Sequence, residues 1–354
     1  MSERLEQCTL SEGYTVSRII KGGWQFSESH SDAKSPTPVE DMFEFTDAGF
    51  TTFDCADIYT GVEELIGEFR AQYRAERGED PSVQVHTKFV PDRQKLDNIS
   101  REYVERIIDR SRNRLGVDAL DLVQFHWWDY SVDNYVETAS ILADLREEGK
   151  IRHIGVTNFD TPHLEDLVEA GIPVVSNQVQ YSLLDARPER EMTEFCRSHD
   201  VQLLCYGTLA GGFLTGSYLQ EPDPGDALDM ENRSLTKYKL VIEDTGGWEL
   251  YQNLLTTANE IATKHDVSIA NVATRYVLDQ PQVCAAIVGA RNTRHIESNR
   301  RTLGFELDEE DHRRLEAARS KLTGLPGGVY SVERDRDSDH AKIMKYNLNE
   351  EQGT

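Results

Sequence analysis

The chain lacks an apolar run of the roughly 18 residues that a membrane-spanning helix needs. Glu3, Arg4 and Glu6 stand where a signal peptide would need its apolar core. The five cysteines show no C-x-x-C spacing, so neither a disulfide framework nor a zinc knuckle is indicated, and we expect reduced thiols. These absences predict a cytoplasmic protein that neither spans nor binds a membrane and that holds no metal.

Basic residues are few: 38 Lys and Arg stand against 63 Asp and Glu, a net charge of −25. This charge repels phosphate backbones and anionic lipids, so neither nucleic acid nor membrane is an expected partner. Only 11 of the 38 basic residues are Lys. An acidic chain that prefers Arg to Lys suits a salt-rich cytoplasm, which we take as a hypothesis beside the simpler alternative of a well-solvated surface.

Short apolar segments alternate with stretches of helical period, a pattern typical of βα units. Eight strands are predicted, beginning at Arg18, Thr51, Val83, Leu120, Ile151, Val174, Val201 and Cys284. Eight buried parallel strands close most economically into a (β/α)8 barrel, with a doubly wound sheet as the alternative. No G-x-G-x-x-G follows the first strand, which disfavours a Rossmann sheet.

Two regions depart from the repeating pattern. A Gly- and Pro-bearing loop from Gly207 to Trp248 follows the seventh strand and is longer than ordinary connections. The segment after residue 322 turns polar and charged, so it is either frayed or folded across the barrel mouth. We therefore expect one α/β TIM-barrel domain over residues 1–322 and a tail over residues 323–354.

Polar residues at the carboxyl ends of the strands are the candidates for chemistry, because the active sites of barrel enzymes lie at the face where the strands end. Asp54 ends the second strand with Tyr59 shortly after it, Lys88 ends the third strand and His126 ends the fourth. Each has a structural explanation alone, but together on adjacent strands they fit proton donation to a carbonyl. A phenol is too weak an acid near neutrality unless a cation stabilises the phenolate. Lys88 supplies that cation, Asp54 keeps it protonated, and His126 donates a hydrogen bond to the substrate oxygen.

In order and strand position these four residues resemble the Asp-Tyr-Lys-His tetrad of the aldo/keto reductases, and the likeness covers roughly Leu10 to Leu322. The resemblance implies an oxidoreductase that transfers hydride between NAD(P)H and an aldehyde, ketone or sugar, with Tyr59 as proton donor. No Rossmann domain would be needed, because the nicotinamide would lie extended across the barrel mouth.

The resemblance also implies a cofactor site. Thr157, Asn158 and Gln178 match ligands of the nicotinamide carboxamide, and Tyr206 matches the residue that stacks on its ring. The remaining implied cofactor contacts are Gly22, Gly23, Gly207, Thr208, Leu209, Gly211, Gly289, Ala290, Arg291, His295 and Asn299. Gly289 and His295 replace a Lys and an Arg that many members use for the 2′-phosphate, although Arg291 and Arg294 suit that phosphate. NADP(H) is slightly favoured over NAD(H).

Aromatic side chains are expected to wall the substrate pocket, which suits apolar aldehydes or the faces of sugars. Trp24 and Trp127 are the candidates, and because Trp127 and Trp128 are consecutive only one of them should point inward. Two other functions remain open. A nicotinamide-binding regulatory subunit would need the cofactor site but not the proton donor. A glycosidase would need two strand-end acids facing one cavity, whereas only Asp54 is clearly so placed.

Overall fold

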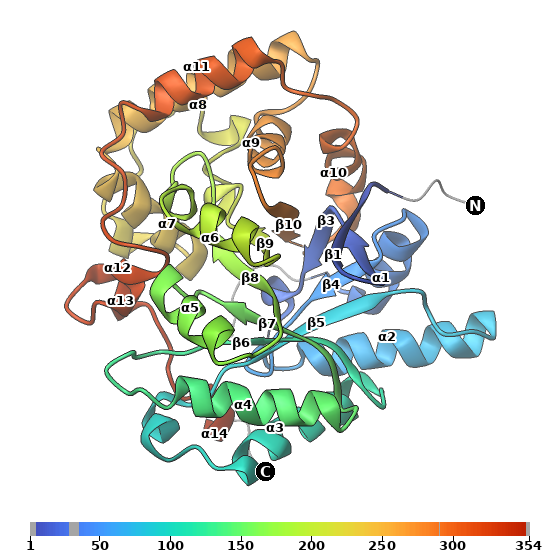
Figure 1. Ribbon diagram of the computed structural model, residues 1–354. Coiled ribbons are helices and arrows are strands. Elements are labelled where there is room, and N and C mark those ends of the chain that lie inside the picture. Colours follow the sequence, from blue (N-terminus) through green and yellow to red (C-terminus); the bar gives the residue numbers. More distant parts are fainter. Residues whose placement is uncertain (1–4, 28–34, 290, 352–354) are drawn as a thin grey trace.

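The computed structural model describes residues 5–27, 35–289 and 291–351, and its centre is a closed barrel of parallel strands (Figure 1). Each strand pairs with the next along the chain, and the last pairs with the first. The barrel strands are β3 (Ile19–Gly22), β4 (Thr52–Asp54), β5 (Gln84–Phe89), β6 (Leu120–Phe125), β7 (Ile151–Thr157), β8 (Val174–Gln180), β9 (Gln202–Tyr206) and β10 (Val283–Gly289). All eight predicted strands and the barrel fold are confirmed.

Helices surround the barrel (Figure 1). The sequence of α3 shows why a helix forms here and where it ends. Val104, Ile107 and Ile108 form a buried stripe, Ser100 caps the first turn, and Gly116 ends the helix in a left-handed conformation. The outer helices are α1 (Pro38–Asp47), α2 (Val62–Arg77), α3 (Arg101–Leu115), α4 (Tyr135–Glu147), α5 (Thr161–Glu169), α6 (Met192–Ser198), α8 (Trp248–Lys264), α9 (Ile269–Leu278), α10 (Ile296–Thr302) and α11 (Glu309–Arg319). Short 3-10 helices lie at Trp24–Phe26, Arg93–Asn98, Arg187–Glu189, Ala210–Gly212, Gly216–Tyr218, Ala227–Asp229 and Thr293–His295.

A hairpin that the sequence did not predict precedes the barrel. Strands β1 (Gln7–Ser11) and β2 (Tyr14–Ser17) pair antiparallel around Gly13, whose φ of 73° suits a tight turn. Leu10 and Val16 of the hairpin pack against Leu122 and Leu204 of the barrel strands. The hairpin therefore closes the end of the barrel at which the strands begin.

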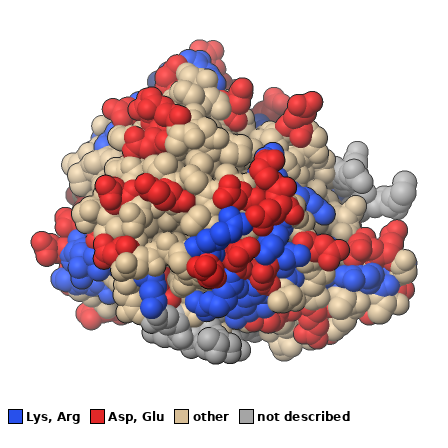
Figure 2. All heavy atoms as spheres, turned by 60° about the horizontal axis from the view of Figure 1, so that its bottom comes forward, with Lys and Arg blue, Asp and Glu red and all other residues tan. Residues whose placement is uncertain are grey.

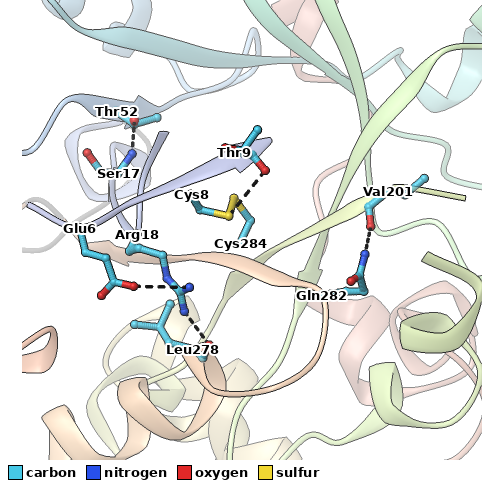
Figure 3. The surroundings of a disulfide bond; sticks show 10 residues. All are labelled: Glu6, Cys8, Thr9, Ser17, Arg18, Thr52, Val201, Leu278, Gln282 and Cys284. Atoms are coloured by element: carbon cyan, nitrogen blue, oxygen red, sulfur yellow. Dashed lines mark hydrogen bonds and ion pairs between the residues drawn. A yellow bond between two sulfur atoms is a disulfide. The ribbon is translucent and has the colours of Figure 1, made fainter. Parts of the chain in front are cut away.

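A disulfide joins this hairpin to the barrel (Figure 3). Cys8 of β1 and Cys284 of β10 are bonded with their Cα atoms 5.5 Å apart, an ordinary spacing for a disulfide. The expectation of five reduced thiols is therefore wrong for this pair, and Cys55, Cys196 and Cys205 are free and buried. The two bonded cysteines are 276 residues apart in sequence, and they meet only because the unpredicted hairpin folds against β10.

The long loop after β9 contains helix α7 (Arg233–Asp244), which packs against the turn that follows the strand. Gly207 and Gly211 of that turn have left-handed φ angles of 77° and 66°. A Cβ atom on Gly207 would lie 2.4 Å from the Tyr238 hydroxyl oxygen, and one on Gly211 would lie 2.8 Å from the Tyr238 ring. These two glycines therefore serve the close packing of α7, a role that the sequence did not indicate.

The tail after residue 322 runs from α11 past α12 (Ser331–Arg334) and α13 (Asp339–Lys342) to α14 (Leu348–Glu351) (Figure 1). We call the end of the barrel at which the strands finish the C-terminal mouth. The tail contacts residues that follow several strand ends at this mouth: Tyr330 packs 5.5 Å from His126 between ring centroids, and Arg334 donates to the carbonyls of Trp127 and Asn158, each at 2.9 Å. The division into domain 1–322 and tail 323–354 stays a prediction.

One buried cation holds the tail to the barrel. Arg187, after β8, binds Asp185 at 2.7 Å and Glu333 of α12 at 2.9 Å, and all three side chains are buried. Replacing Arg187 by Met would leave two buried carboxylates without their counter-charge, so we expect a loss of about 3–5 kcal/mol in the free energy of unfolding. Urea unfolding measures this loss.

The matched control for this prediction is Arg197→Met, because Arg197 pairs with Glu194 on the exposed surface. Exposed ion pairs contribute about 0–1 kcal/mol, so this variant should unfold close to the wild type. Equal unfolding midpoints for the two variants would contradict the assigned role of Arg187.

Acidic and basic side chains are interspersed over the face shown in Figure 2. Exposed pairs join α3 to α4 and its C-terminal cap, as Arg101 binds Asp144 and Glu148. Within the described residues, no helix is both long and apolar enough to cross a membrane. The salt-rich cytoplasm remains a hypothesis.

Candidate active site

Lys88 and Asp54 form a buried ion pair at the C-terminal mouth. The Lys88 Nζ atom donates to Asp54 Oδ1 at 2.6 Å and to the Cys55 carbonyl at 2.8 Å. Burial by itself would lower the pKa of Lys88, but the Asp54 carboxylate, and the Tyr59 phenolate once it forms, outweigh it and raise this pKa above its ordinary value. Lys88 is therefore an ammonium ion over the whole physiological range.

Two glutamine amides complete the surroundings of Asp54. Gln178 Nε2 donates to Asp54 Oδ2 at 2.6 Å and to Gln124 Oε1 at 2.8 Å, and Gln124 Nε2 donates to Asp54 Oδ2 at 3.0 Å. The Gln178 amide nitrogen thus uses both of its hydrogens within the protein. Sequence reasoning missed Gln124, although it precedes His126 by two residues and side chains two apart share one face of a strand.

Tyr59 lies in the loop after β4 with a half-buried ring. The Lys88 Nζ atom is 5.1 Å from the centre of this ring. Burial raises the pKa of Tyr59 above its ordinary value, and the Lys88 charge acts in the opposite direction. The phenol is therefore protonated near neutral pH, while the neighbouring ammonium favours the phenolate that remains once the proton has left.

His126 follows β6, and its ring is fixed by one hydrogen bond. Nδ1 lies 3.1 Å from the carbonyl oxygen of Thr157, and because a carbonyl can only accept, Nδ1 carries the hydrogen. Burial, and next the charge of Arg334, lower the pKa of His126 to about 3, so the ring is neutral. Nε2 is buried and bonds no described residue. In this tautomer Nε2 is an acceptor, which differs from the donor role expected from the sequence.

The aromatic residues beside His126 differ from those expected. Trp128 packs edge-on against His126 with ring centroids 4.4 Å apart, and Tyr346 of the tail contacts Trp128 at 5.0 Å. Trp127 instead lies fully buried in the core, where its indole N–H donates to the carbonyls of Asp129 and Val132. Trp127 therefore does not face a pocket as the sequence led us to expect, and Trp128 is the indole ring that packs beside His126. Because consecutive side chains of a strand point to opposite faces, the sequence predicted that one of the two tryptophans points inward but not which one.

The ends of β7, β8 and β9 meet beside the tetrad. Thr157 Oγ1 donates to the Gln178 carbonyl at 3.2 Å, and the Tyr206 hydroxyl donates to Asn158 Oδ1 at 2.8 Å. Asn158 has a left-handed φ of 62°, which Asn tolerates better than most residues. The four residues expected at the nicotinamide are thus neighbours in the fold, although Gln178 and Asn158 already have partners.

The residues expected near the rest of the cofactor lie around β3, β9 and β10. Gly22 ends β3 and Gly23 follows it, and both are closely packed. A Cβ atom on Gly23 would lie 2.8 Å from Val62, and one on Gly22 would lie 3.0 Å from Ile287. Trp24 follows them half-buried. After β9, Thr208 is buried and Leu209 is half-buried.

Buried polar atoms of Gln25, which follows β3, and of Asn299 in α10 test whether the residues fit a cofactor. Asn299 Nδ2 and Gln25 Oε1 are buried and bond no described residue, and the Gln25 side chain lies against Gly289. A ligand with its own donors and acceptors would satisfy each of these atoms, so both residues fit such a group. Arg291 and His295 lie on the same connection, and Ala290 lies outside the described residues.

The side-chain partners of Asp54 among the described residues are Lys88, Gln124 and Gln178, and none of them is the second acid that a glycosidase needs. Glu63, which follows on α2, is fully buried and accepts from Thr87 at 2.6 Å, with Arg114 at 3.5 Å. Asp54 already accepts hydrogen bonds from Lys88 and from two glutamines. The arrangement suits acid catalysis by Tyr59 beside a fixed cation better than a pair of carboxylates.

Comparison with known proteins agrees with this geometry. A family model described as the aldo/keto reductase family matches residues 18–320. The NADH-specific methylglyoxal reductase of Escherichia coli is 28% identical over 84% of this chain and 93% of its own length. The glycerol dehydrogenase structure from Gluconobacter oxydans has a TM-score of 0.72 at 25% identity, over 89% of this chain and 94% of that one. An aldo-keto reductase from Klebsiella pneumoniae in complex with NADPH has a TM-score of 0.64 at 23% identity, over 90% and 95%.

Proposed function

Because the chain belongs to the aldo/keto reductase family, we propose that its C-terminal mouth is the active site and that Tyr59 donates the proton to the substrate oxygen. The protein is an NAD(P)-dependent oxidoreductase that transfers hydride between the cofactor and a carbonyl compound. The single observation that carries the residue assignment is the position of Lys88 Nζ, bonded to Asp54 and 5.1 Å from the Tyr59 ring centre.

The protein's own groups divide the work of the reduction. When bound, the nicotinamide supplies hydride to the carbonyl carbon. Tyr59 gives its hydroxyl proton to the carbonyl oxygen, and the phenolate left behind lies beside the Lys88 ammonium, whose own charge is held by Asp54. Gln124 donates to the Asp54 carboxylate and holds it in place.

His126 acts as a hydrogen-bond acceptor in this proposal. Its neutral ring directs the bare Nε2 lone pair away from the Thr157 carbonyl, so it can accept from a hydroxyl but cannot donate to a carbonyl. The group that presents such a hydroxyl is the alcohol, which is the product of reduction and the substrate of oxidation. His126 would therefore position the alcohol at Tyr59.

The cofactor would be held by residues at five strand ends. Thr157, Asn158, Gln178 and Tyr206 are proposed at the nicotinamide, with Gln178 and Asn158 exchanging their present partners for the carboxamide. Further contacts are proposed at Gly22, Gly23, Gly207, Thr208, Leu209, Gly211, Gly289, Ala290, Arg291, His295 and Asn299. NADP(H) is slightly preferred in this proposal because Arg291 and Arg294 suit a 2′-phosphate. The E. coli relative is NADH-specific and the K. pneumoniae neighbour is in complex with NADPH, so relatives differ in this respect.

The proposal is tested by following cofactor absorbance at 340 nm with a panel of aldehydes, ketones and sugars, using NADPH and NADH at equal concentration. We expect turnover with at least one carbonyl class, and faster turnover with NADPH. A clear NADH preference would contradict the cofactor proposal alone. Tight cofactor binding without turnover on any carbonyl would contradict the reductase assignment and favour the nicotinamide-binding regulatory subunit.

A cytoplasmic location remains part of the proposal. The three buried free thiols support it, since reduced cysteines are usual in that compartment. The Cys8–Cys284 bond weighs against it, because structural disulfides are rare in most cytoplasms.

A further inference from the structure

Both polar atoms of the Asn349 side chain, near the end of the tail, make hydrogen bonds. It lies buried in α14, and its Nδ2 donates to Asp57 Oδ2 at 3.0 Å and to the Val90 carbonyl at 2.7 Å. Its Oδ1 accepts from Arg110 of α3, and its backbone N–H donates to Asp92 at 2.8 Å. One amide thus bonds residues that are 239, 259 and 292 positions away in sequence.

The two segments that Asn349 links are those that carry the proposed chemistry. Asp57 lies between Cys55, whose carbonyl binds Lys88, and Tyr59. Val90 follows Lys88 by two residues, and its N–H donates to Asp57 Oδ2 at 3.1 Å. The separation of Tyr59 from Lys88 is therefore set partly by the contact between Asp57 and Val90, and Asn349 bonds both members of that contact.

We infer that Asn349 is a positioning residue, which fastens the loop carrying Tyr59 to the strand end carrying Lys88. This inference rests on the proposed function of Tyr59. Asn349 itself touches neither catalytic side chain, so its effect is on geometry: a displacement of about 1 Å at the reacting groups costs about 10²-fold in rate. Weakening the link should lower kcat while leaving cofactor binding nearly unchanged.

The surroundings of Asp57 make the link sensitive to a change of charge. Burial raises the pKa of Asp57 to about 7. The ionisable groups around it are Glu63 of α2, Asp92 after β5, Tyr59, and three residues of α3, Tyr103, Arg110 and Arg114. Asn349→Asp would place a second carboxyl against Asp57, and a pair of facing carboxyls holds together only while it shares a proton.

The experiment compares kcat and the cofactor Kd of Asn349→Asp and Asn349→Ala with the wild type between pH 6 and pH 9. Because the shared proton is lost as the pH rises, the ratio of kcat for Asn349→Asp to that of wild type should fall by about tenfold from pH 6 to pH 9. Asn349→Ala should lower kcat by about tenfold or more at every pH, with the Kd changed less than about threefold. Asn347→Asp is the control, since Asn347 accepts from the exposed Gln94 N–H and bonds neither Asp57 nor Val90 among the described residues; the ratio of its kcat to that of wild type should stay flat.

Each outcome decides the inference. The inference would be overturned if folded Asn349→Asp kept the same kcat relative to wild type from pH 6 to pH 9. It would also be overturned if both Asn349 variants failed to fold at every pH, because Asn349 would then serve the fold alone. If Asn349→Ala alone fails to fold, the pH series of Asn349→Asp decides. Tyr59→Phe is measured beside them: turnover that survives in Tyr59→Phe removes the proposed function, whereas its loss together with a flat Asn349→Asp ratio removes only the positioning role.

Discussion

Replacing Lys88 by methionine is expected to lower kcat by about 10²–10⁴-fold, the usual contribution of general acid catalysis. The phenolate that forms as Tyr59 releases its proton would lose the cation 5.1 Å from its ring, and no other cation lies on Asp54 among the described residues. Steady-state turnover of cofactor at 340 nm measures the loss. Cofactor binding, followed by fluorescence, should remain.

The same substitution should also destabilise the protein, because Asp54 would be left buried without its partner at a cost of about 3–5 kcal/mol. The double variant Asp54→Asn with Lys88→Met separates the two effects. Removing both charges should recover most of the free energy of unfolding while turnover stays low. If turnover recovered together with stability, Lys88 would be a structural residue and its proposed chemical role would be wrong.

The barrel could be predicted from the sequence because its signals are local. Each strand is a short apolar run, each following stretch has a helical period, and all eight strand positions are confirmed. The pairing of Lys88 with Asp54 followed from the same pattern, since the carboxyl ends of adjacent parallel strands lie side by side. These predictions needed no knowledge of contacts between distant segments beyond the barrel itself.

The features that sequence reasoning missed depend on distant contacts or on a choice between neighbours. Cys8 meets Cys284 through a hairpin whose strands of four and five residues gave no clear signal. Trp127 and Trp128 occupy consecutive positions, and packing rather than composition decides which of them faces His126. The direction of the His126 hydrogen bond depends on where the Thr157 carbonyl lies, which only the fold determines.

The tail shows the same limit. Its polar composition predicted either fraying or contact with the barrel mouth, and the composition alone gave no partner for Glu333 or Asn349. In the fold, Glu333 binds the buried Arg187 and Asn349 binds Asp57, so a segment of low hydrophobicity is held by buried polar contacts. Such contacts need specific geometry, and no pattern of spacing along the chain encodes them.

The most direct test of the central claim is the turnover of Tyr59→Phe, measured at 340 nm beside the wild type with the same carbonyl and cofactor. Phenylalanine keeps the ring beside Lys88 but lacks the hydroxyl that is proposed to give the proton. The account predicts that kcat falls by about 10²–10⁴-fold while the cofactor dissociation constant stays close to that of the wild type. A variant that turns over at the wild-type rate would contradict the account, because the proton would then come from another group.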